Sequence, residues 1–276
     1  MRYLSYAPGP PLSQFVELLW LAEGVNTSYQ RERLLPTGSV ELVINLLDEP
    51  MQVYVDTDAT DPISFQHSVI SGPHSRYFVL DTYGTTAVIG AHFRPGGAYP
   101  FVHHPLSSLR NLHVSLDTIW GRRGHEWRER ILATPSIQQR FQLLEQALLT
   151  QLAEWSTANP MLDHAIHVLS APHPISVPQL SDQLGIGPRR LGQLFQQHVG
   201  LSPKQFYRLQ RFQHAVGQSF QALQVDWADL ALQCGYYDQA HFSHDFRAFS
   251  GLAPGTYWQQ RGRHPNHVPL DVSLQG

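Results

Sequence analysis

The stretch LALQCGYYDQAHFSHDFRAFSGLAPGTY, residues 230–257, repeats a pattern that the chain already contains in residues 180–206. Before a short turn the two copies lie 50 residues apart, and the matched positions are Leu180, Leu184 and Gly185 with Leu230, Cys234 and Gly235. After the turn they lie 51 residues apart, and the matched positions are Leu191, Phe195, Gly200, Leu201, Pro203 and Phe206 with Phe242, Phe246, Gly251, Leu252, Pro254 and Tyr257. Matches on both sides of a one-residue insertion indicate a duplicated structural unit.

Each copy predicts two helices joined by a tight turn. In the first copy, a capping-box pattern at Ser176 and Gln179 precedes a helix over residues 177–184, and Pro188 begins a helix over residues 188–199. In the second copy, Asp226 caps residues 227–234 and Asp238 caps residues 239–249. Gly185 and Gly235 follow the first helix of each copy, where the backbone commonly turns left-handed. Two copies of such a unit predict two helical units that each read a segment of DNA.

The segment between the copies predicts one long connecting helix. Ser202 and Gln205 form another capping box, and apolar residues recur at helical spacing from residue 203 to about residue 220. A helix of about 18 residues spans about 27 Å, whereas one turn of B-DNA separates successive major-groove faces by about 34 Å. A connector of this length is suited to hold two recognition helices on one face of a duplex.

The sequence LALQCGYYDQAHFSHDFRAFSGLAPGTYWQQR, residues 230–261, resembles the signature of AraC/XylS-type bacterial transcription regulators. The resemblance covers about residues 160–263 and includes the Gly200-Leu201-Ser202-Pro203 sequence after the first recognition helix. It implies an all-α domain with two helix-turn-helix subdomains joined by a linker helix. It also implies an N-terminal domain that supplies effector sensing or dimerisation.

The resemblance further implies that outward side chains near the start of each recognition helix contact the bases. The matching positions are Arg189, Arg190 and Gln193 in the first helix and Gln239, Ala240, His241, Ser243 and His244 in the second. Gly192 and His244 depart from the family pattern, which often has a long polar side chain and an arginine at these positions. The alternative for all of these residues is a solvated helix surface with no DNA contact.

A second set of basic residues is suited to position the phosphate backbone, which orients a protein without reading sequence. These residues are Lys204, Arg208 and Arg247. Gln197, which is not part of this set, is expected to point outward from the first recognition helix. Arg211 has two interpretations, an ion pair with Asp226 or Asp229, or a contact with DNA.

The charge balance is unusual for a DNA-binding protein. The formal net charge is −3, and residues 160–276 hold eight Arg and Lys against seven Asp. Lys204 is the single lysine of the chain, so the positive charge is almost all arginine, the side chain that contacts guanine and phosphate in a bidentate manner. Because non-specific affinity depends on the number of phosphates neutralised, we expect it to be weak.

The first half of the chain has the features of a β-rich domain. Short runs rich in Val, Ile, Tyr and Phe occupy residues 40–47, 52–55, 77–83 and 87–93, and they predict a small β-barrel or sandwich. The resemblance to AraC-type regulators implies that this barrel is cupin-like. PTGSVELVINL at residues 36–46 and GAHFRPGGAYPF at residues 90–101 resemble the sensor-like N-terminal domain of one branch of AraC-type regulators. The two halves together give an α+β chain of two domains.

Metal and catalytic sites receive little support from this half. The histidines are numerous (His67, His74, His92, His103, His104 and His113), but the His-x-His pattern of cupin metal sites is absent. There is no Gly-x-Ser-x-Gly sequence, and Cys234 matches Leu184 of the first copy, which predicts a buried apolar role. Arg94 is a candidate for an anionic ligand or for a structural salt bridge. We therefore expect no cofactor, no metal and no enzymatic activity.

The domain prediction places a β-rich sensor or dimerisation domain in residues 1–122 and a helical connector in residues 123–159. Residues 160–263 form the DNA-binding domain and residues 264–276 a loose tail. The connector carries an amphipathic helix at residues 136–154, which packs on the barrel or pairs two copies of the chain, and a hinge at residues 155–160.

These features predict a cytoplasmic, sequence-specific transcription regulator. We expect no leader sequence, because no apolar signal-peptide core follows Met1. No apolar run approaches the length of a membrane span, and a single cysteine fits a reducing compartment. Promoter DNA is the expected partner, with RNA polymerase, a small-molecule effector and a second copy of the chain as further candidates. The alternative is the same DNA-binding module joined to a catalytic or metal-dependent barrel.

Overall fold

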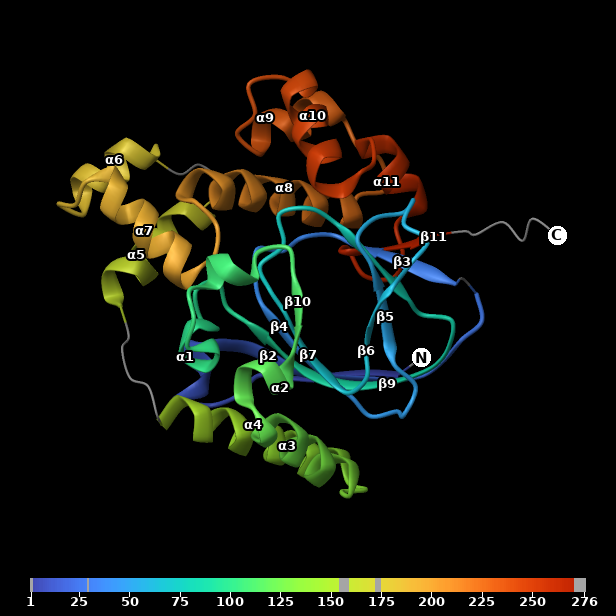
Figure 1. Ribbon diagram of the computed structural model, residues 1–276. Coiled ribbons are helices and arrows are strands. Elements are labelled where there is room, and N and C mark those ends of the chain that lie inside the picture. The colour runs from blue at the N-terminus through green and yellow to red at the C-terminus, as the bar shows by residue number, and fades with distance from the viewer. Residues whose placement is uncertain (1, 29, 154–158, 172–174, 271–276) are drawn as a thin grey trace.

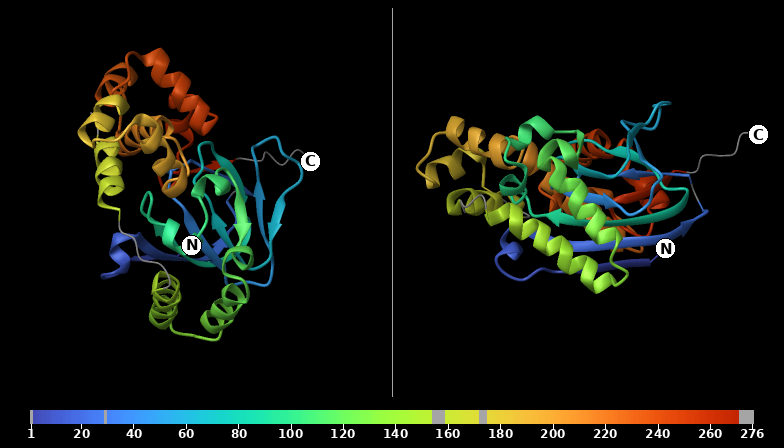
Figure 2. Two further views of the ribbon diagram at one scale, coloured as in Figure 1. Left: turned by 60° about the vertical axis from the view of Figure 1, so that its left-hand side comes forward. Right: turned by 60° about the horizontal axis from the view of Figure 1, so that its bottom comes forward.

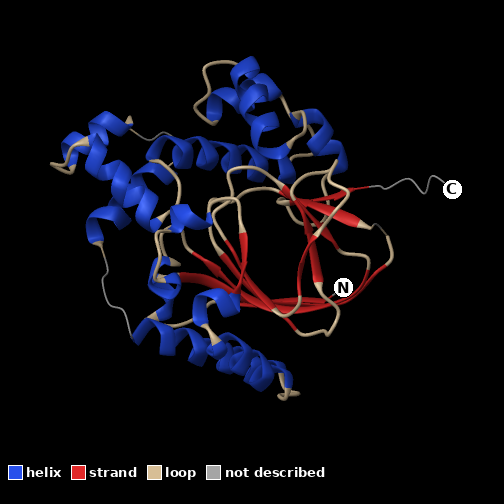
Figure 3. Ribbon diagram, in the orientation of Figure 1, coloured by secondary structure: helices blue, strands red, loops and turns tan. Residues whose placement is uncertain are grey.

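A computed structural model of the chain describes residues 2–28, 30–153, 159–171 and 175–270 as two β-sheets with surrounding helices (Figures 1 and 3). The first sheet has the strand order β1-β2-β9-β4-β7-β10, and the second has the order β11-β3-β8-β5-β6. The strands are β1 (Arg2–Tyr6), β2 (Val16–Asn26), β3 (Arg31–Leu34), β4 (Glu41–Asn45), β5 (Met51–Tyr54), β6 (Ile63–Phe65), β7 (Ser68–Ser71), β8 (Phe78–Asp81), β9 (Gly84–Phe93), β10 (His113–Ser115) and β11 (His267–Leu270).

The four strands predicted from the sequence are confirmed as β4, β5, β8 and β9. The prediction missed β2, which is 11 residues long and pairs with both β1 and β9. Its sequence VELLWLAEGVN does not alternate between apolar and polar residues, because apolar side chains lie on both of its faces and the pairing with β9 is irregular between Val16 and Leu18. Leu19 and Leu21 are buried in the hydrophobic core, whereas Trp20 on the other face donates a hydrogen bond to Glu41.

Three helices close one side of the first sheet. They are α2 (Leu116–Trp120), α3 (Arg122–Leu132) and α4 (Ile137–Ala153). α4 confirms the helix predicted at residues 136–154, and Leu144 and Leu148 of its apolar stripe are fully buried in the same core as Leu19 and Leu42. The stripe therefore packs within the chain, against the sheet. The predicted hinge at residues 155–160 lies mostly outside the described residues.

The C-terminal helices form a second hydrophobic core and lie on the side of the sheets away from α3 and α4 (Figures 1 and 2). They are α5 (Pro160–Ser170), α6 (Val177–Gln183), α7 (Pro188–His198), α8 (Pro203–Gln221), α9 (Trp227–Gln233), α10 (Gln239–Ser250) and α11 (Pro254–Gln260). None of the described helices has the length and apolar composition that crossing a membrane requires. The remaining short helices are η1 (Leu12–Gln14), α1 (Tyr99–Val102) and η2 (Leu106–Leu109).

The prediction of a loose tail after residue 263 is wrong for the described part of that segment. Residues 267–270 form β11, which pairs antiparallel with β3, and Val268 is fully buried. His267 Nδ1 lies 2.9 Å from Glu32 Oε2. The pairing partner is more than 230 positions away, so no local pattern revealed it, and Pro269 is tolerated because β11 is an edge strand.

The two halves of the chain are in direct contact. Leu35, which follows β3, is buried in the core of the C-terminal helices. Gln213 of α8 donates a hydrogen bond of 2.7 Å to the carbonyl oxygen of Pro36. The helix α8, which connects the two copies of the duplicated pattern, therefore lies on the N-terminal sheets, residues 2–115, which we call the β-domain.

Candidate nucleic-acid interface

Both helix-turn-helix copies have the capping interactions that the sequence predicts. In the first, the Ser176 hydroxyl accepts a hydrogen bond from the Gln179 amide at 3.4 Å, and the Gln179 side chain accepts one from the Ser176 amide at 2.9 Å. In the second, Asp238 Oδ1 accepts from the His241 amide at 2.7 Å. Gly185 and Gly235 have φ values of 65° and 75°, which glycine adopts without strain. The local sequence thus determines where α6 and the recognition helix α10 begin, whereas the recognition helix α7 begins at Pro188 without a side-chain cap.

A single helix joins the two copies. α8 has 19 residues, about 28 Å at 1.5 Å per residue, and begins with the predicted capping box at Ser202 and Gln205. Its buried face carries Phe206, Leu209, Phe212 and Val216, all fully buried. The predicted connector is confirmed, and each end of it packs on one helix-turn-helix copy.

The start of α7 presents its predicted base-contact residues to solvent. Arg189, Arg190 and Gln193 are exposed, whereas Leu191, Leu194 and Phe195 face the core. Gln197, one turn further along, does not point freely outward as predicted. Its side-chain amide donates a hydrogen bond of 2.7 Å to the Tyr99 hydroxyl of the β-domain. The free surface of α7 is therefore confined to its first two turns.

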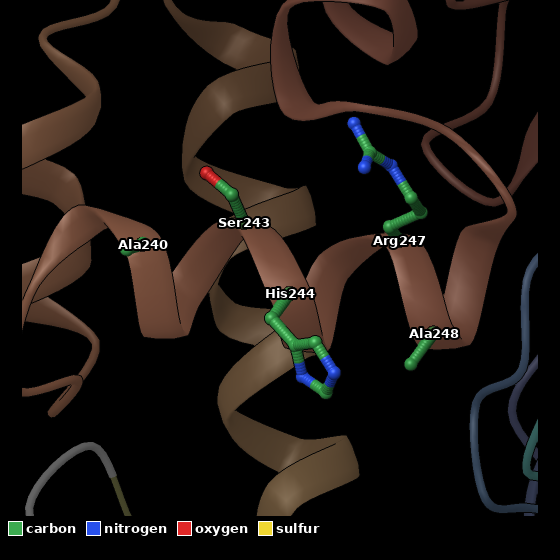
Figure 4. Close-up of a pocket in the computed structure, with 5 residues that line it drawn as sticks. All are labelled: Ala240, Ser243, His244, Arg247 and Ala248. Carbon is green, nitrogen blue, oxygen red and sulfur yellow. The ribbon is translucent and has the colours of Figure 1, made fainter.

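The start of α10 is also open to solvent. Gln239, Ala240, His241 and His244 are exposed, and Ser243 is half-buried. Three of these residues (Ala240, Ser243 and His244), together with Arg247 and Ala248, line an open hollow of about 390 Å³ on the outer face of the helix. Ser243 and Arg247 lie along one side of it, and His244 and Ala248 along the other (Figure 4). The small side chains of Ala240 and Ala248 leave room for another molecule to approach the helix.

A buried carboxylate, Asp245, holds α10 on α8. Its side chain is 2% exposed and accepts hydrogen bonds from Arg208 Nη2 at 2.6 Å and Arg208 Nε at 3.2 Å. This hydrogen bond to Asp245 raises the pKa of Arg208. Arg208 was predicted to contact phosphate, but its guanidinium is engaged by Asp245 because the inward face of α10 supplies a carboxylate directly above it.

Arg211 lies in the same cluster and is 6% exposed. Its guanidinium donates to the carbonyl oxygen of Gly235 at 2.8 Å and lies 3.4 Å from Asp245 Oδ2. The rings of Tyr207 and Tyr236 lie 4.7 Å and 4.1 Å from its central carbon. The structural interpretation of Arg211 is correct, but the predicted partners, Asp226 and Asp229, are wrong. Asp226 instead caps α9.

Two further residues of this surface were missed by the sequence analysis. Tyr237 directly precedes the cap of α10 and is 87% exposed, and Ala248 lines the hollow on the same helix. Tyr237 could have been found from the sequence, because it is an aromatic residue in the turn before a recognition helix. A tyrosine at such a position has few apolar neighbours and is expected to be exposed. Ala248 gave no signal, since an alanine in a helix is compatible with any surface. Lys204 and Arg247, predicted to contact phosphate, are both exposed.

The other candidate residues from the sequence are histidines and Arg94 of the β-domain and Cys234 at the end of α9. Within the described residues, no three His, Cys, Asp or Glu side chains are grouped as metal ligands would be. His92 pairs with Glu41, and His74 packs against His113 with ring centroids 4.7 Å apart. Arg94 Nε donates to the carbonyl oxygen of Ser13 at 2.9 Å. Cys234 is buried, and burial raises the pKa of its thiol to about 11.

Two family models match the chain. Residues 180–260 match a helix-turn-helix domain, and residues 4–115 match a family described as a domain of unknown function (DUF6597). The first match covers both recognition helices and α8, and the second covers the two-sheet domain.

Among the characterised relatives, the activator RhaR of Klebsiella pneumoniae is 31% identical over 126 residues, which is 42% of this chain and 44% of that protein. The regulator GlxA of Rhizobium meliloti is 27% identical over 198 residues, which is 69% of this chain and 53% of that protein. Both are named as helix-turn-helix transcriptional regulators. The chain thus spans about half the length of the relatives it matches.

The solved structures include a regulator with an AraC-type DNA-binding domain from Chromobacterium violaceum, at 26% identity and a TM-score of 0.35. The match covers 38% of this chain and 94% of the Chromobacterium violaceum chain. The structure of ToxT from Vibrio cholerae covers 87% of this chain and 97% of that one, at 10% identity and a TM-score of 0.48.

Proposed function

Because residues 180–260 form a helix-turn-helix domain of the AraC type, we propose that this protein is a sequence-specific regulator of transcription. Its two recognition helices read two successive major-groove segments of promoter DNA. The observation that carries this proposal is the pair of equivalent, solvent-exposed helix starts, α7 and α10, joined through one 19-residue helix. A connector of about 28 Å suits two contacts about one turn of B-DNA apart.

The proposed base contacts come from the exposed first turns of both helices. They are Arg189, Arg190 and Gln193 of α7 and Gln239, Ala240, His241, Ser243 and His244 of α10. The arginines are suited to guanine and the glutamines to adenine, in each case through two parallel hydrogen bonds. Lys204 and Arg247 are proposed to bind phosphate. Arg208 is left out of the interface because Asp245 engages its guanidinium.

The β-domain is proposed to modulate DNA binding without catalysing a reaction. An effector regulates only if it binds the two DNA-affinity states with different free energies. The contacts of Tyr99 with Gln197 in the first copy and of Tyr77 with Phe249 in the second give the β-domain direct access to both helix-turn-helix copies. RNA polymerase, a small-molecule effector and a second copy of the chain are the partners we propose. We propose that the protein acts in the bacterial cytoplasm, where its DNA is located.

The proposal is tested by selection of genomic fragments with the full-length protein, followed by fluorescence anisotropy on the enriched DNA at near-physiological salt. We expect a shared motif with two half-boxes about one helical turn apart. Arg189→Ala and Gln239→Ala should weaken binding to different half-boxes. The proposal would be overturned if the selection enriched no sequence and the protein bound DNA in a salt-sensitive manner that neither variant changed.

A further inference from the structure

One loop of the β-domain, residues 72–77, touches both helix-turn-helix copies at equivalent positions. We call it the bridging loop. Gly200 and Gly251 are matched residues of the duplicated pattern, and each follows its recognition helix with a left-handed φ, 82° and 71°. A Cβ atom at Gly200 would lie 2.4 Å from Cγ of Pro73, and one at Gly251 would lie 2.4 Å from Cε1 of Tyr77. The missing side chains let the same loop approach both copies closely.

A direct hydrogen bond reinforces the contact with the second copy. The Tyr77 amide donates to the carbonyl oxygen of Phe249, at the end of α10, over 2.9 Å. The contact with the first copy includes η2, since a Cβ atom at Gly200 would also lie 2.8 Å from the carbonyl oxygen of Leu106. Both recognition helices therefore meet the β-domain at their C-terminal ends, away from the exposed starts proposed to contact DNA.

The bridging loop is fixed within the β-domain. The Ser75 amide donates to the Asn111 side chain at 2.8 Å, and the Asn111 amide donates to the carbonyl oxygen of Pro73 at 3.2 Å. His74, 6% exposed, lies 3.2 Å from the Ser71 hydroxyl, and its ring packs on Phe78 with centroids 4.5 Å apart. The four peptide units from Pro73 to Tyr77 span at most about 14 Å. The loop is thus a short spacer of fixed conformation.

We propose that the bridging loop sets the relative orientation of the two recognition helices, and thereby the spacing of the half-boxes that the protein accepts. This inference rests on the proposed function. α8 packs on both copies within one hydrophobic core, and the bridging loop adds a contact from outside that core to the far end of each recognition helix. This second, shared contact restricts the movement of one copy relative to the other before DNA binds, which lowers the entropic cost of engaging both half-boxes. Pro73 and Tyr77 are the positioning residues.

The proposal predicts a change in how the affinity depends on the spacing of the half-boxes, more than a change in the affinity itself. One additional base pair moves a half-box by about 3.4 Å and turns it by about 35° around the duplex. A rigid pair of recognition helices cannot follow both changes, whereas two loosely joined copies can. A residue that only supported the fold would alter affinity on every DNA to the same extent.

The test uses the full-length protein and the operator obtained by genomic selection, with variants carrying one or two extra base pairs between the half-boxes. One glycine is inserted between Ser75 and Arg76, and Tyr77→Ala is a second variant that leaves the loop length intact. A glycine inserted between Thr60 and Asp61, both exposed, is the matched control. Circular dichroism melting establishes that each variant is folded.

We expect the wild type and the control to lose about tenfold or more in affinity for each added base pair, the size of a mismatched contact. The loop variants should lose less than about threefold, and their affinity for DNA with a single half-box should equal that of the wild type. Equal spacing dependence of the wild type and the folded loop variants would overturn the inference. Failure of the wild type to bind any selected DNA would overturn the proposed function and this inference with it.

Discussion

The two helix-turn-helix copies share one pattern, yet their recognition helices are held in place by different interactions. Position 194 of α7 and position 245 of α10 are equivalent, since they lie 51 residues apart like their neighbours. The first is Leu194, which is 6% exposed in an apolar core, and the second is Asp245, which is 2% exposed and paired with Arg208 and Arg211. In residues 175–221, which the structure describes without a gap, no ion pair holds α7 to its neighbours.

The comparison shows that one local fold tolerates two kinds of interior. α7 is fixed by apolar packing and, at its far end, by Gln197 on Tyr99 of the β-domain. α10 also packs in the apolar core and contacts the β-domain at its far end, through Phe249 and Tyr77, but it has in addition a buried ionic cluster with α8. A buried ion pair gains little net free energy when intact, but loss of one partner leaves an uncompensated charge. We therefore expect the second copy to be more sensitive to single polar substitutions.

Asp245→Asn should have the largest effect on this difference. It leaves Arg211 buried without a counter-charge, so we expect the free energy of unfolding to fall by about 3–5 kcal/mol. Urea denaturation measures this loss, and Asp182→Asn, at an exposed position of α6, is the control. The triple variant Asp245→Leu, Arg208→Leu, Arg211→Met imitates the apolar interior of the first copy and should recover most of the stability. If Asp245→Asn is as stable as its control, the two copies are not held differently.

Arg189→Ala and Gln239→Ala separate the two copies in DNA binding. Each substitution should remove one bidentate base contact, about 1–3 kcal/mol, and relax the sequence preference of its own half-box. Binding titrations on operators mutated in one half-box at a time measure both effects. Arg263→Ala, an exposed arginine outside the proposed interface, controls for the loss of one charge. Identical effects of the two variants on both half-boxes would mean that the copies do not read separate sites.

Lys204→Ala and Arg247→Ala should have smaller effects, because each removes one phosphate contact. We expect affinity to fall by a similar factor on all sequences, and the slope of log K against log salt to become less negative by about 1 for each. Gln218→Ala, at an exposed position of α8, is the uncharged control. An unchanged salt slope for either variant would remove that residue from the proposed interface.

The smallest effect concerns Cys234, which occupies the position of Leu184 in the first copy. Because burial raises the pKa of the thiol to about 11, the reactive thiolate is scarce at pH 8, and access to it is blocked as well. A colorimetric thiol reagent should leave Cys234 unmodified in the folded protein and label it fully in denaturant. Rapid labelling of the folded protein would show that the second copy opens at this position.

The sequence by itself determined the local units of this protein. The caps at Ser176, Ser202, Asp226 and Asp238 and the turns at Gly185 and Gly235 involve residues at most a few positions apart, so a single stretch of sequence contains both partners of each interaction. The exposed starts of α7 and α10 followed from the same helical periodicity. For the same reason the strands β4, β5, β8 and β9 were predicted, whereas β2, which has apolar side chains on both faces, was not.

Only the tertiary structure decided how these units are joined. Asp245 meets Arg208 and Arg211 across two helices, β11 pairs with a strand at the opposite end of the chain, and Tyr77 meets Phe249 from another domain. Each partner is chosen by the folded geometry among many residues of suitable charge or hydrogen-bonding capacity. The role of Arg208 illustrates this point, because an arginine on a helix surface has the same sequence pattern whether its partner is a phosphate or a buried carboxylate.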